Sequence, residues 1–354
     1  MIRPPSSQLI EFLNSTPLPW IRYDEAKGKL IVVVDNHMLQ TYRNCAQHFF
    51  YSHVEGYQKK SGVREGEKER AWYLDFGVLL HKMLEVYYQE FQKPGFDATK
   101  WASERAVAEW NEMNMNVHSE HKEFKVIGGM FGFAGLLMQY ALIMTPLNEK
   151  LRVLGTEVSF GRNGEVPLFI GEDLEIYLAG RMDLIIDDGY FICPIDHKTM
   201  GAFRGDPGLQ FETEEGPTGY IYALSKILPQ FVPEDQLLKR DCSKILMNLI
   251  QKKPAATPQE RFKRVPVRKT MQQLVDYQYR MINTVEHLIT DLTLYVGFGN
   301  VPRNTTACTN WHMTTCAFRD VCRQSSRDAE QSTLTNGFLK MPIWDTEKVT
   351  PTTF

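Results

Sequence analysis

Hydrophobic side chains recur every three or four residues over several stretches of the chain, which is the spacing of one face of an α-helix. The clearest stretch runs from Ala71 to about Phe91, where Phe76, Leu80 and Met83 share a face. The same period predicts helices at about 37–57, 98–117, 122–149, 217–228 and 267–295. Residues 1–29 show one short amphipathic piece and no sustained period, and we expect an irregular segment there.

Short runs rich in β-branched and aromatic residues lie between these helices and predict strands. They occur at about 30–34, 152–160, 174–186, 190–195 and 244–250. Two dipeptides, Asn163-Gly164 and Asp188-Gly189, are typical of the two-residue turn of a β-hairpin. We therefore expect an α/β fold. It would have a mainly helical part at 30–150, a sheet and long helix at 151–300, a cysteine-bearing segment at 301–325 and a loosely held tail at 326–354.

The second dipeptide lies within residues 180–199, GRMDLIIDDGYFICPIDHKT, and we expect the rest of the chain to be organised around this stretch. If Asp188 and Gly189 form the turn, Asp183 pairs with Pro194 on the opposite strand. A proline cannot donate a hydrogen bond within a ladder, so we expect a bulge or a local break at that position.

Charged side chains gather on one face of this predicted hairpin. Side chains alternate across a strand, so Asp196 and Lys198 share the face of Pro194, and Asp183 points to it as well. Two carboxylates and an ammonium group are costly to bury together unless a divalent cation lies among them. The alternative is an exposed hairpin with a surface salt bridge, which the apolar neighbours of these charges disfavour.

Composition narrows the class of protein. The 354 residues carry a formal net charge of −3, which argues against a generally basic nucleic-acid binder but permits a local basic groove. No uninterrupted apolar run approaches the roughly 20 residues of a membrane span, and the N-terminus lacks the apolar core of a secretory signal. We therefore expect an intracellular, cytoplasmic protein with no membrane partner, whose six cysteines stay reduced and act as ligands or core residues.

Positive charge concentrates between the hairpin and the long helix. This stretch could follow a phosphate backbone, or it could be a solvated loop. The residues are Arg204, Lys252, Lys253, Arg261, Lys263, Arg264, Arg268 and Lys269.

Two further positions are candidates for chemistry. Gly77, His81 and Glu85 recur every four residues and so lie on one stripe of a predicted helix. A histidine–glutamate pair at this spacing is either an ordinary surface pair or part of a site. Glu157 stands among apolar residues in a predicted strand, where its carboxylate has either a structural or a functional role.

Three cysteines lie within fifteen residues of one another: Cys308, Cys316 and Cys322. Such a group suggests a metal or cluster site, although its spacing matches neither a zinc ribbon nor a ferredoxin. Cys193 falls on the hairpin face opposite Asp196 and is expected in the core, and Cys242 lies in a polar turn.

Together these residues resemble the PD-(D/E)XK nuclease superfamily, and most of all its RecB-type branch with an iron–sulfur cluster, over roughly residues 37–325. That branch has a Gly-x-x-x-His helix, a Gly-x-x-Asp strand and an Asp/Glu-x-Lys strand. Here the matching segments are Gly77 to His81, Gly180 to Asp183 and Asp196 to Lys198. The branch also has one cysteine before the nuclease core and three after it, here Cys45 and the three C-terminal cysteines.

The chain departs from this pattern at two points. The family usually follows its lysine strand with a Gln-x-x-x-Tyr helix, whereas Gly216 occupies the glutamine position before Tyr220. The gap from Cys308 to Cys316 is also wider than the usual spacing.

The resemblance implies a restriction-endonuclease-like core, with a mixed central sheet flanked by helices, and a metal-dependent DNA nuclease, as an exonuclease or end-processing enzyme. Asp183, Asp196 and the backbone carbonyl of His197 would bind Mg²⁺ or Mn²⁺. His81 would complete the site, and Lys198 would lie beside the attacking water. Four residues would hold a structural [4Fe–4S] cluster, with zinc as the alternative: Cys45, Cys308, Cys316 and Cys322.

The resemblance also implies a substrate and partners. The substrate would be DNA, as single strands or duplex ends, and the protein partners would belong to recombination, repair or CRISPR-type systems in a bacterial or phage setting. The competing hypothesis is a nuclease-fold DNA-binding or assembly subunit with little or no catalytic activity.

Overall fold

A computed structural model of the chain describes residues 5–59, 72–161, 163–203, 205–237, 240–255, 257–299, 301–308 and 315–343. The chain forms two compact units, and each is assembled from segments that are distant in the sequence. The first unit contains residues 1–69, 159–180 and 275–354. The second contains residues 70–158 and 181–274.

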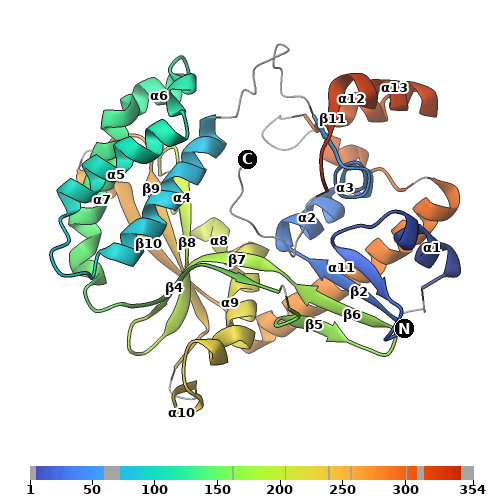
Figure 1. The fold of residues 1–354 in the computed structure, drawn as a ribbon, viewed down its shortest axis with the longest axis horizontal. Helices are drawn as coiled ribbons and strands as arrows, with labels where there is room; N and C mark the ends of the chain where they lie inside the picture. The colour runs from blue at the N-terminus through green and yellow to red at the C-terminus, as the bar shows by residue number, and fades with distance from the viewer. Residues whose placement is uncertain are drawn as a thin grey trace. The chain divides into compact units, whose positions relative to one another are not determined.

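A five-stranded mixed sheet forms the centre of the second unit, in the order β10-β9-β8-β7-β4 (Figure 1). β8 and β9 are parallel, whereas β7 with β8 and β9 with β10 are antiparallel. The predicted α/β architecture is therefore confirmed. The strands are β4 (Arg152–Phe160), β7 (Gly180–Asp187), β8 (Ile192–Met200), β9 (Lys244–Gln251) and β10 (Phe262–Arg268).

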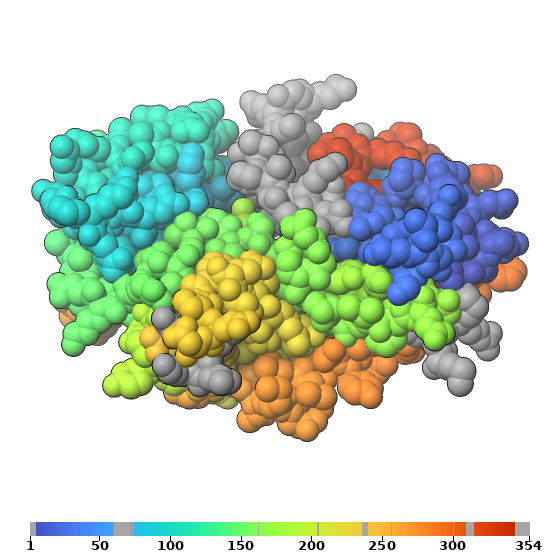
Figure 2. Space-filling view, turned by 60° about the horizontal axis from the view of Figure 1, so that its bottom comes forward, coloured from blue at the N-terminus to red at the C-terminus, as the bar shows by residue number. Residues whose placement is uncertain are grey.

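Helices flank this sheet. The long helices α4, α5 and α7 share a hydrophobic core with Leu184, Ile186, Cys193 and Ile195 of the central hairpin. Cys193 is therefore a core residue, as predicted. α9 packs on β8 and β9, and Figure 2 shows the segment of α9 and α10, in gold, at the molecular surface. The helices are α4 (Trp72–Glu90), α5 (Ala98–Glu112), η1 (Met115–His118), α6 (Lys122–Ile127), α7 (Gly129–Asn148), α8 (Leu209–Thr213), α9 (Glu215–Ile227), η2 (Leu228–Gln230), α10 (Glu234–Leu237) and η3 (Pro258–Arg261).

Among the described residues, α7 is the one helix long and apolar enough to cross a membrane by length and composition. A single helix of this kind is weak evidence for a span, because the core helix of a globular protein has the same properties. α7 places Phe133, Leu137, Tyr140 and Met144 in the core of the second unit.

The first unit contains a four-stranded sheet in the order β1-β2-β6-β5, in which β2 and β6 are parallel. A two-stranded sheet brings β3 beside β11, from opposite ends of the chain. The elements, which include most of α11, are α1 (Ser7–Ser15), β1 (Ile21–Asp24), β2 (Lys29–Val34), α2 (Asn36–Asn44), α3 (Ala46–His53), β3 (Tyr57–Lys59), β5 (Pro167–Ile170), β6 (Leu174–Leu178), α11 (Met271–Phe298), η4 (Thr305–Cys308), α12 (Arg319–Cys322), α13 (Arg327–Gly337) and β11 (Phe338–Lys340).

Two predicted helices are each divided into two α-helices. The helix expected at 37–57 ends at Asn44, because Cys45 has extended backbone angles, and α3 begins after it. The helix expected at 122–149 breaks at Gly128, whose left-handed conformation (φ +89°) ends α6 before α7 begins. Local backbone conformation, rather than hydrophobic period, decides both breaks.

The strand predictions are wrong in three places. Asn163-Gly164 does not close a hairpin, because β4 and β5 belong to different sheets. The single strand expected at 174–186 is divided into β6 and β7, which also lie in different sheets. β10 was not predicted, since its lysine and arginine residues read as a charged loop.

Both ends of the chain are more regular than predicted. Residues 1–29, expected to be irregular, contain α1 and β1. The tail expected at 326–354 contains α13 and β11, and its Leu334 and Phe338 are buried in the first unit.

Candidate functional site

The turn of the central hairpin lies one residue further along the chain than predicted. The N–H of Asp188 donates to the carbonyl of Phe191 (3.0 Å), so Gly189 and Tyr190 are the turn residues. Gly189 adopts φ +94°, a conformation that glycine tolerates without strain. The Asp188 carboxylate also accepts the N–H groups of Tyr190 (2.9 Å) and Phe191 (2.7 Å), which fixes the turn.

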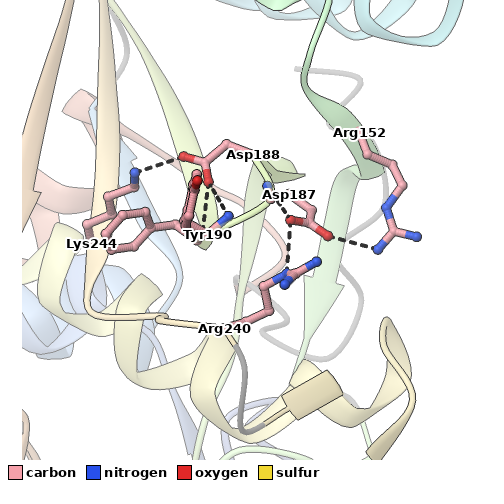
Figure 3. Close-up of polar contacts among 8 residues, drawn as sticks. Arg152, Asp187, Asp188, Tyr190, Arg240 and Lys244 are labelled. Carbon is pink, nitrogen blue, oxygen red and sulfur yellow. Dashed lines mark hydrogen bonds and ion pairs between the residues drawn. The ribbon is translucent and has the colours of Figure 1, made fainter. Parts of the chain in front are cut away.

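Salt bridges hold this turn in place (Figure 3). The buried Asp187 carboxylate pairs with Arg152 (2.9 Å) and Arg240 (3.2 Å). Asp188 pairs with Lys244 of β9 (3.0 Å). Two adjacent aspartates therefore tie the hairpin to neighbouring segments of the second unit, and neither is near in sequence to the residues that bind it.

The observed turn gives different cross-strand pairs from the predicted turn, but each side chain stays on its predicted face of the hairpin. Leu184 pairs with Ile195, and one step further the same register places Asp183 opposite Asp196, so the predicted partner Pro194 was wrong. The register differs from the predicted one by two residues, and a shift of two leaves every side chain on its original face. The ladder shows no break at Pro194, where a bulge was expected.

The Asp183 carboxylate is held from two sides. One oxygen accepts the backbone N–H of His197 (2.7 Å), and the other lies 3.4 Å from Nδ1 of His81 on α4. Burial alone would raise the pKa of Asp183, but the imidazole of His81 holds that pKa well below its usual range. Burial alone would lower the pKa of His81, but the Asp183 charge raises it to about 9. At neutral pH the pair is therefore a carboxylate and an imidazolium.

Glu157 joins this group from β4. Its backbone is left-handed (φ +49°), which is uncommon for a residue with a side chain and marks a locally constrained strand. Burial, with the nearby Asp183 charge, raises the pKa of Glu157 to about 7, although its partner Arg181 (2.7 Å) opposes the shift. Among the described residues, His81, Glu157 and Asp183 are the one group of three or more histidine, cysteine or acidic side chains whose potential ligand atoms all lie within 4.8 Å of one another.

Asp196 and Lys198 form the other half of the site. Asp196 is 4% exposed, and one of its oxygens lies 2.8 Å from the Lys198 ammonium group. Burial raises the pKa of Asp196 to about 6, against the effect of Lys198. Burial would lower the pKa of Lys198, but the Asp196 charge raises it. The side chain of Lys198 remains 45% exposed, so its charge is accessible from solvent.

The imidazole of His197 is committed to the core. It is buried, its Nδ1 accepts from the Asn248 amide (2.8 Å), and it stacks on the Tyr88 ring. Burial lowers the pKa of His197 to about 3, so the ring is neutral. Glu85, on the stripe of His81, accepts instead from Gln89 (3.2 Å).

Much of the predicted basic stretch is structural. Lys252, Arg261 and Lys269 are buried, and Lys252 pairs with Glu123 (2.8 Å). Arg264 donates to a buried tyrosine. The phosphate-binding hypothesis was therefore too broad, and of this set the exposed described residues are Lys253, Lys263 and Arg268. Arg204 lies outside the described residues.

The four cysteines named by the resemblance line one cavity of about 110 Å³ in the first unit: Cys45, Cys308, Cys316 and Cys322. The break between α2 and α3 supplies the first, and the end of α12 supplies the last. The N–H of Cys316 donates to the carbonyl of Cys308 (3.0 Å). The fold thus collects at one point side chains that lie at opposite ends of the sequence.

The lining of the cavity is mainly apolar, and it also includes His48. Burial raises the pKa of Cys316, and it raises that of Cys322 to about 11, so without a cation both thiols keep their protons. Nδ1 of His48 lies 3.8 Å from Cys316 Sγ. Arg303 is among the arginines that line the cavity.

The comparisons with known proteins identify the family. The PD-(D/E)XK nuclease superfamily matches residues 37–323. The chain belongs to this superfamily. The restriction-endonuclease-like core predicted from the sequence is confirmed by this match and by the mixed sheet flanked by helices. PD-(D/E)XK members are generally phosphodiesterase nucleases that use divalent metals and act on DNA, so membership suggests a metal-dependent nuclease.

A search of curated proteins found no match for this PD-(D/E)XK chain. Among solved structures, one described as "Crystal structure of SSO0001" is similar over 70% of this chain and 96% of its own, with 16% identity and a TM-score of 0.28.

Proposed function

We propose that the protein is a metal-dependent nuclease of the RecB-type branch that hydrolyses phosphodiester bonds at DNA ends. The observation that carries this proposal is the convergence of His81, Glu157 and Asp183 beside the salt bridge between buried Asp196 and solvent-accessible Lys198. Four different elements of the second unit supply these side chains. The end-processing role, and partners from recombination, repair or CRISPR-type systems in an intracellular setting, rest on the motif resemblance.

The donor set fits a hard divalent cation. Carboxylate oxygens suit Mg²⁺ and Mn²⁺, and an imidazole in the set favours Mn²⁺. Asp183, Asp196 and the carbonyl of His197 would hold the ion, with His81 and Glu157 completing the site. An ion would also stabilise the charged carboxylates of Glu157 and Asp196, whose pKa values are raised chiefly by burial and further by the Asp183 charge.

A bound divalent cation supplies an activated water and offsets negative charge on the phosphate. The protein supplies preorganisation: Asp183 is fixed by the N–H of His197, and Lys198 is anchored by Asp196. Because the Lys198 ammonium group is accessible, it can stabilise the charge that develops on the phosphate oxygens during attack.

We further propose that the four cysteines hold a structural [4Fe–4S] cluster. The four thiols line one cavity, and the order of these cysteines along the chain matches the resemblance, which supports a cluster over zinc. Such a cluster would close a loop from residue 45 to residue 322 and stabilise the first unit.

Digestion of end-labelled DNA with Mn²⁺ tests the nuclease proposal. We expect Lys198→Ala to lower the cleavage rate at least 100-fold, because it removes charge stabilisation at the phosphate. Lys93→Ala, which changes an exposed lysine of the same unit, is the matched control and should cleave like wild type. Circular DNA should resist cleavage if the enzyme requires ends.

Equal cleavage by wild type and Lys198→Ala would refute catalysis at this site. A wild type that binds DNA but cleaves neither form would instead support the assembly-subunit hypothesis.

Anaerobic purification tests the cluster. We expect brown protein with about four iron and four sulfide per chain, and Cys45→Ser should lose most of the iron. Cys242→Ser, which changes a cysteine outside the cavity, should keep it. Colourless protein with one zinc per chain would contradict the cluster assignment.

A further inference from the structure

A continuous buried network of hydrogen bonds lies behind the candidate site in the second unit. Arg264 of β10 donates to the Tyr88 hydroxyl on α4 (2.6 Å), which bonds the Tyr140 hydroxyl on α7 (2.8 Å). The Asn248 amide of β9 donates to the same Tyr140 hydroxyl (2.9 Å) and to Nδ1 of His197 (2.8 Å). Four elements thus converge on one residue of β8.

This network places several polar side chains in a core. Asn248 is fully buried and Tyr140 is 1% exposed. Buried polar groups stabilise a fold only when they are bonded, and an apolar core of the same volume is often at least as stable. We therefore infer that the network fixes the orientation of particular side chains. It ends at the His197 imidazole, and this is the side chain whose orientation it fixes.

That end point is next to the metal-binding candidates. The Tyr88 and His197 rings stack with an interplanar angle of 17°, and the Asn248 bond acts in the plane of the imidazole. Stacking on Tyr88 restrains tilting of the His197 ring, and the hydrogen bond from Asn248 restrains rotation of the ring within its plane. A restrained side chain restrains its own backbone, and the N–H of His197 is the group that donates to Asp183 (2.7 Å).

We propose that Tyr88 and Asn248 are positioning residues of the metal site. They hold His197 so that its N–H orients Asp183 while its carbonyl oxygen stays directed to the cation. The inference rests on the proposed function, because it assumes that a divalent ion binds at Asp183. Partners that orient metal ligands from outside typically change metal affinity 10- to 100-fold when they are removed.

Binding of Mn²⁺ to the full-length protein tests the inference without relying on cleavage. We expect Tyr88→Phe to weaken Mn²⁺ binding about tenfold by calorimetry, and to alter the electron paramagnetic resonance spectrum of the bound ion. Tyr88→Phe keeps the ring that stacks on His197, so the protein should fold. Asn248→Leu removes the direct bond to the imidazole and should weaken binding at least as much.

Tyr87→Phe is the matched control. Tyr87 is the neighbouring residue on α4, is equally buried, and its hydroxyl bonds Thr145 (3.1 Å) and Asn148 (3.2 Å) rather than the network. Tyr87→Phe removes only this hydroxyl. It should lower the melting temperature as Tyr88→Phe does, while the Mn²⁺ affinity and the electron paramagnetic resonance spectrum stay unchanged.

The following outcomes would overturn the inference. Unchanged Mn²⁺ affinity and spectrum in both network variants would mean that the network only stabilises the fold. Equal weakening by Tyr87→Phe would mean general loosening of α4. A wild type that binds no Mn²⁺, or that binds it as tightly after Asp183→Asn, would refute the proposed metal site as well; affinity lost in Asp183→Asn but kept in the network variants would refute the positioning role alone.

Discussion

At the scale of single residues, neighbours set the charge state on which the site depends. His81 is the clearest case, because Asp183 holds it protonated although it would be a neutral ligand in a metal site. The sequence predicted His81 as a candidate from its helical stripe and the motif, but it could not predict this ion pair. Glu157 is a second case. The sequence showed an acidic residue in an apolar strand, but it did not predict the left-handed backbone of Glu157 or the side chains around it.

Metal binding should therefore release protons. At pH 7 we expect at least one proton released per Mn²⁺, since the pKa of His81 is raised to about 9 and the bound imidazole must be neutral. Protons also compete for Asp196 and Glu157, with pKa values near 6 and 7, so affinity should rise from pH 5 to pH 8. Calorimetry in two buffers of different ionisation enthalpy measures the release.

His81→Gln is the control for this measurement and should remove most of the proton release at pH 7. Heats of binding that are the same in both buffers for the wild type would show that His81 is not displaced from its protonated state.

At the scale of elements, the hairpin prediction failed in register and still gave the correct face. Alternation along a strand depends on parity alone, so an error of two residues preserves it. The turn itself is decided by Asp188, which accepts two backbone N–H groups, and by contacts from Arg152, Arg240 and Lys244 (Figure 3). Those contacts are distant in sequence, so a dipeptide rule could not include them.

The break between α6 and α7 gives a prediction at this scale. A Cβ at Gly132 would overlap the backbone carbonyl of Ile127, whereas Gly135, one turn further along α7, has open space around it. We expect Gly132→Ala to lower the free energy of unfolding by about 2 kcal/mol. Gly135→Ala should raise it by up to about 1 kcal/mol, because alanine favours the helix.

Urea unfolding followed by circular dichroism measures both changes. If the two substitutions shift stability in the same direction by similar amounts, close packing at the break does not determine where α7 begins.

At the scale of the whole molecule, each unit is assembled from segments that alternate along the chain. The cysteine cavity is an example, since its thiols come from residues 45 and 308–322. The tail, predicted to be loose, completes this unit by pairing β11 with β3. The sequence pattern gave no sign of that pairing, because the strands are three residues long.

The proposed cluster in the cysteine cavity should stabilise the first unit, because it would close the loop from residue 45 to residue 322. We expect Cys322→Ser to speed amide hydrogen exchange in α3 at least tenfold, because the link between α3 and α12 is lost. Cys242→Ser is the control, and exchange in α3 should match the wild type. Unaltered exchange in Cys322→Ser would mean that the cysteines do not support the unit.

The sequence by itself determined the α/β class, the family motifs and the shared face of Asp183, Asp196 and Lys198, because hydrophobic period and strand alternation are local properties. It also determined that Cys193 belongs to the core. Only the tertiary structure decided the turn at Gly189, the division of residues 174–186 between two sheets and the approach of Glu157 to His81. These depend on contacts between distant segments and on backbone conformations that packing imposes, and no local pattern encodes them.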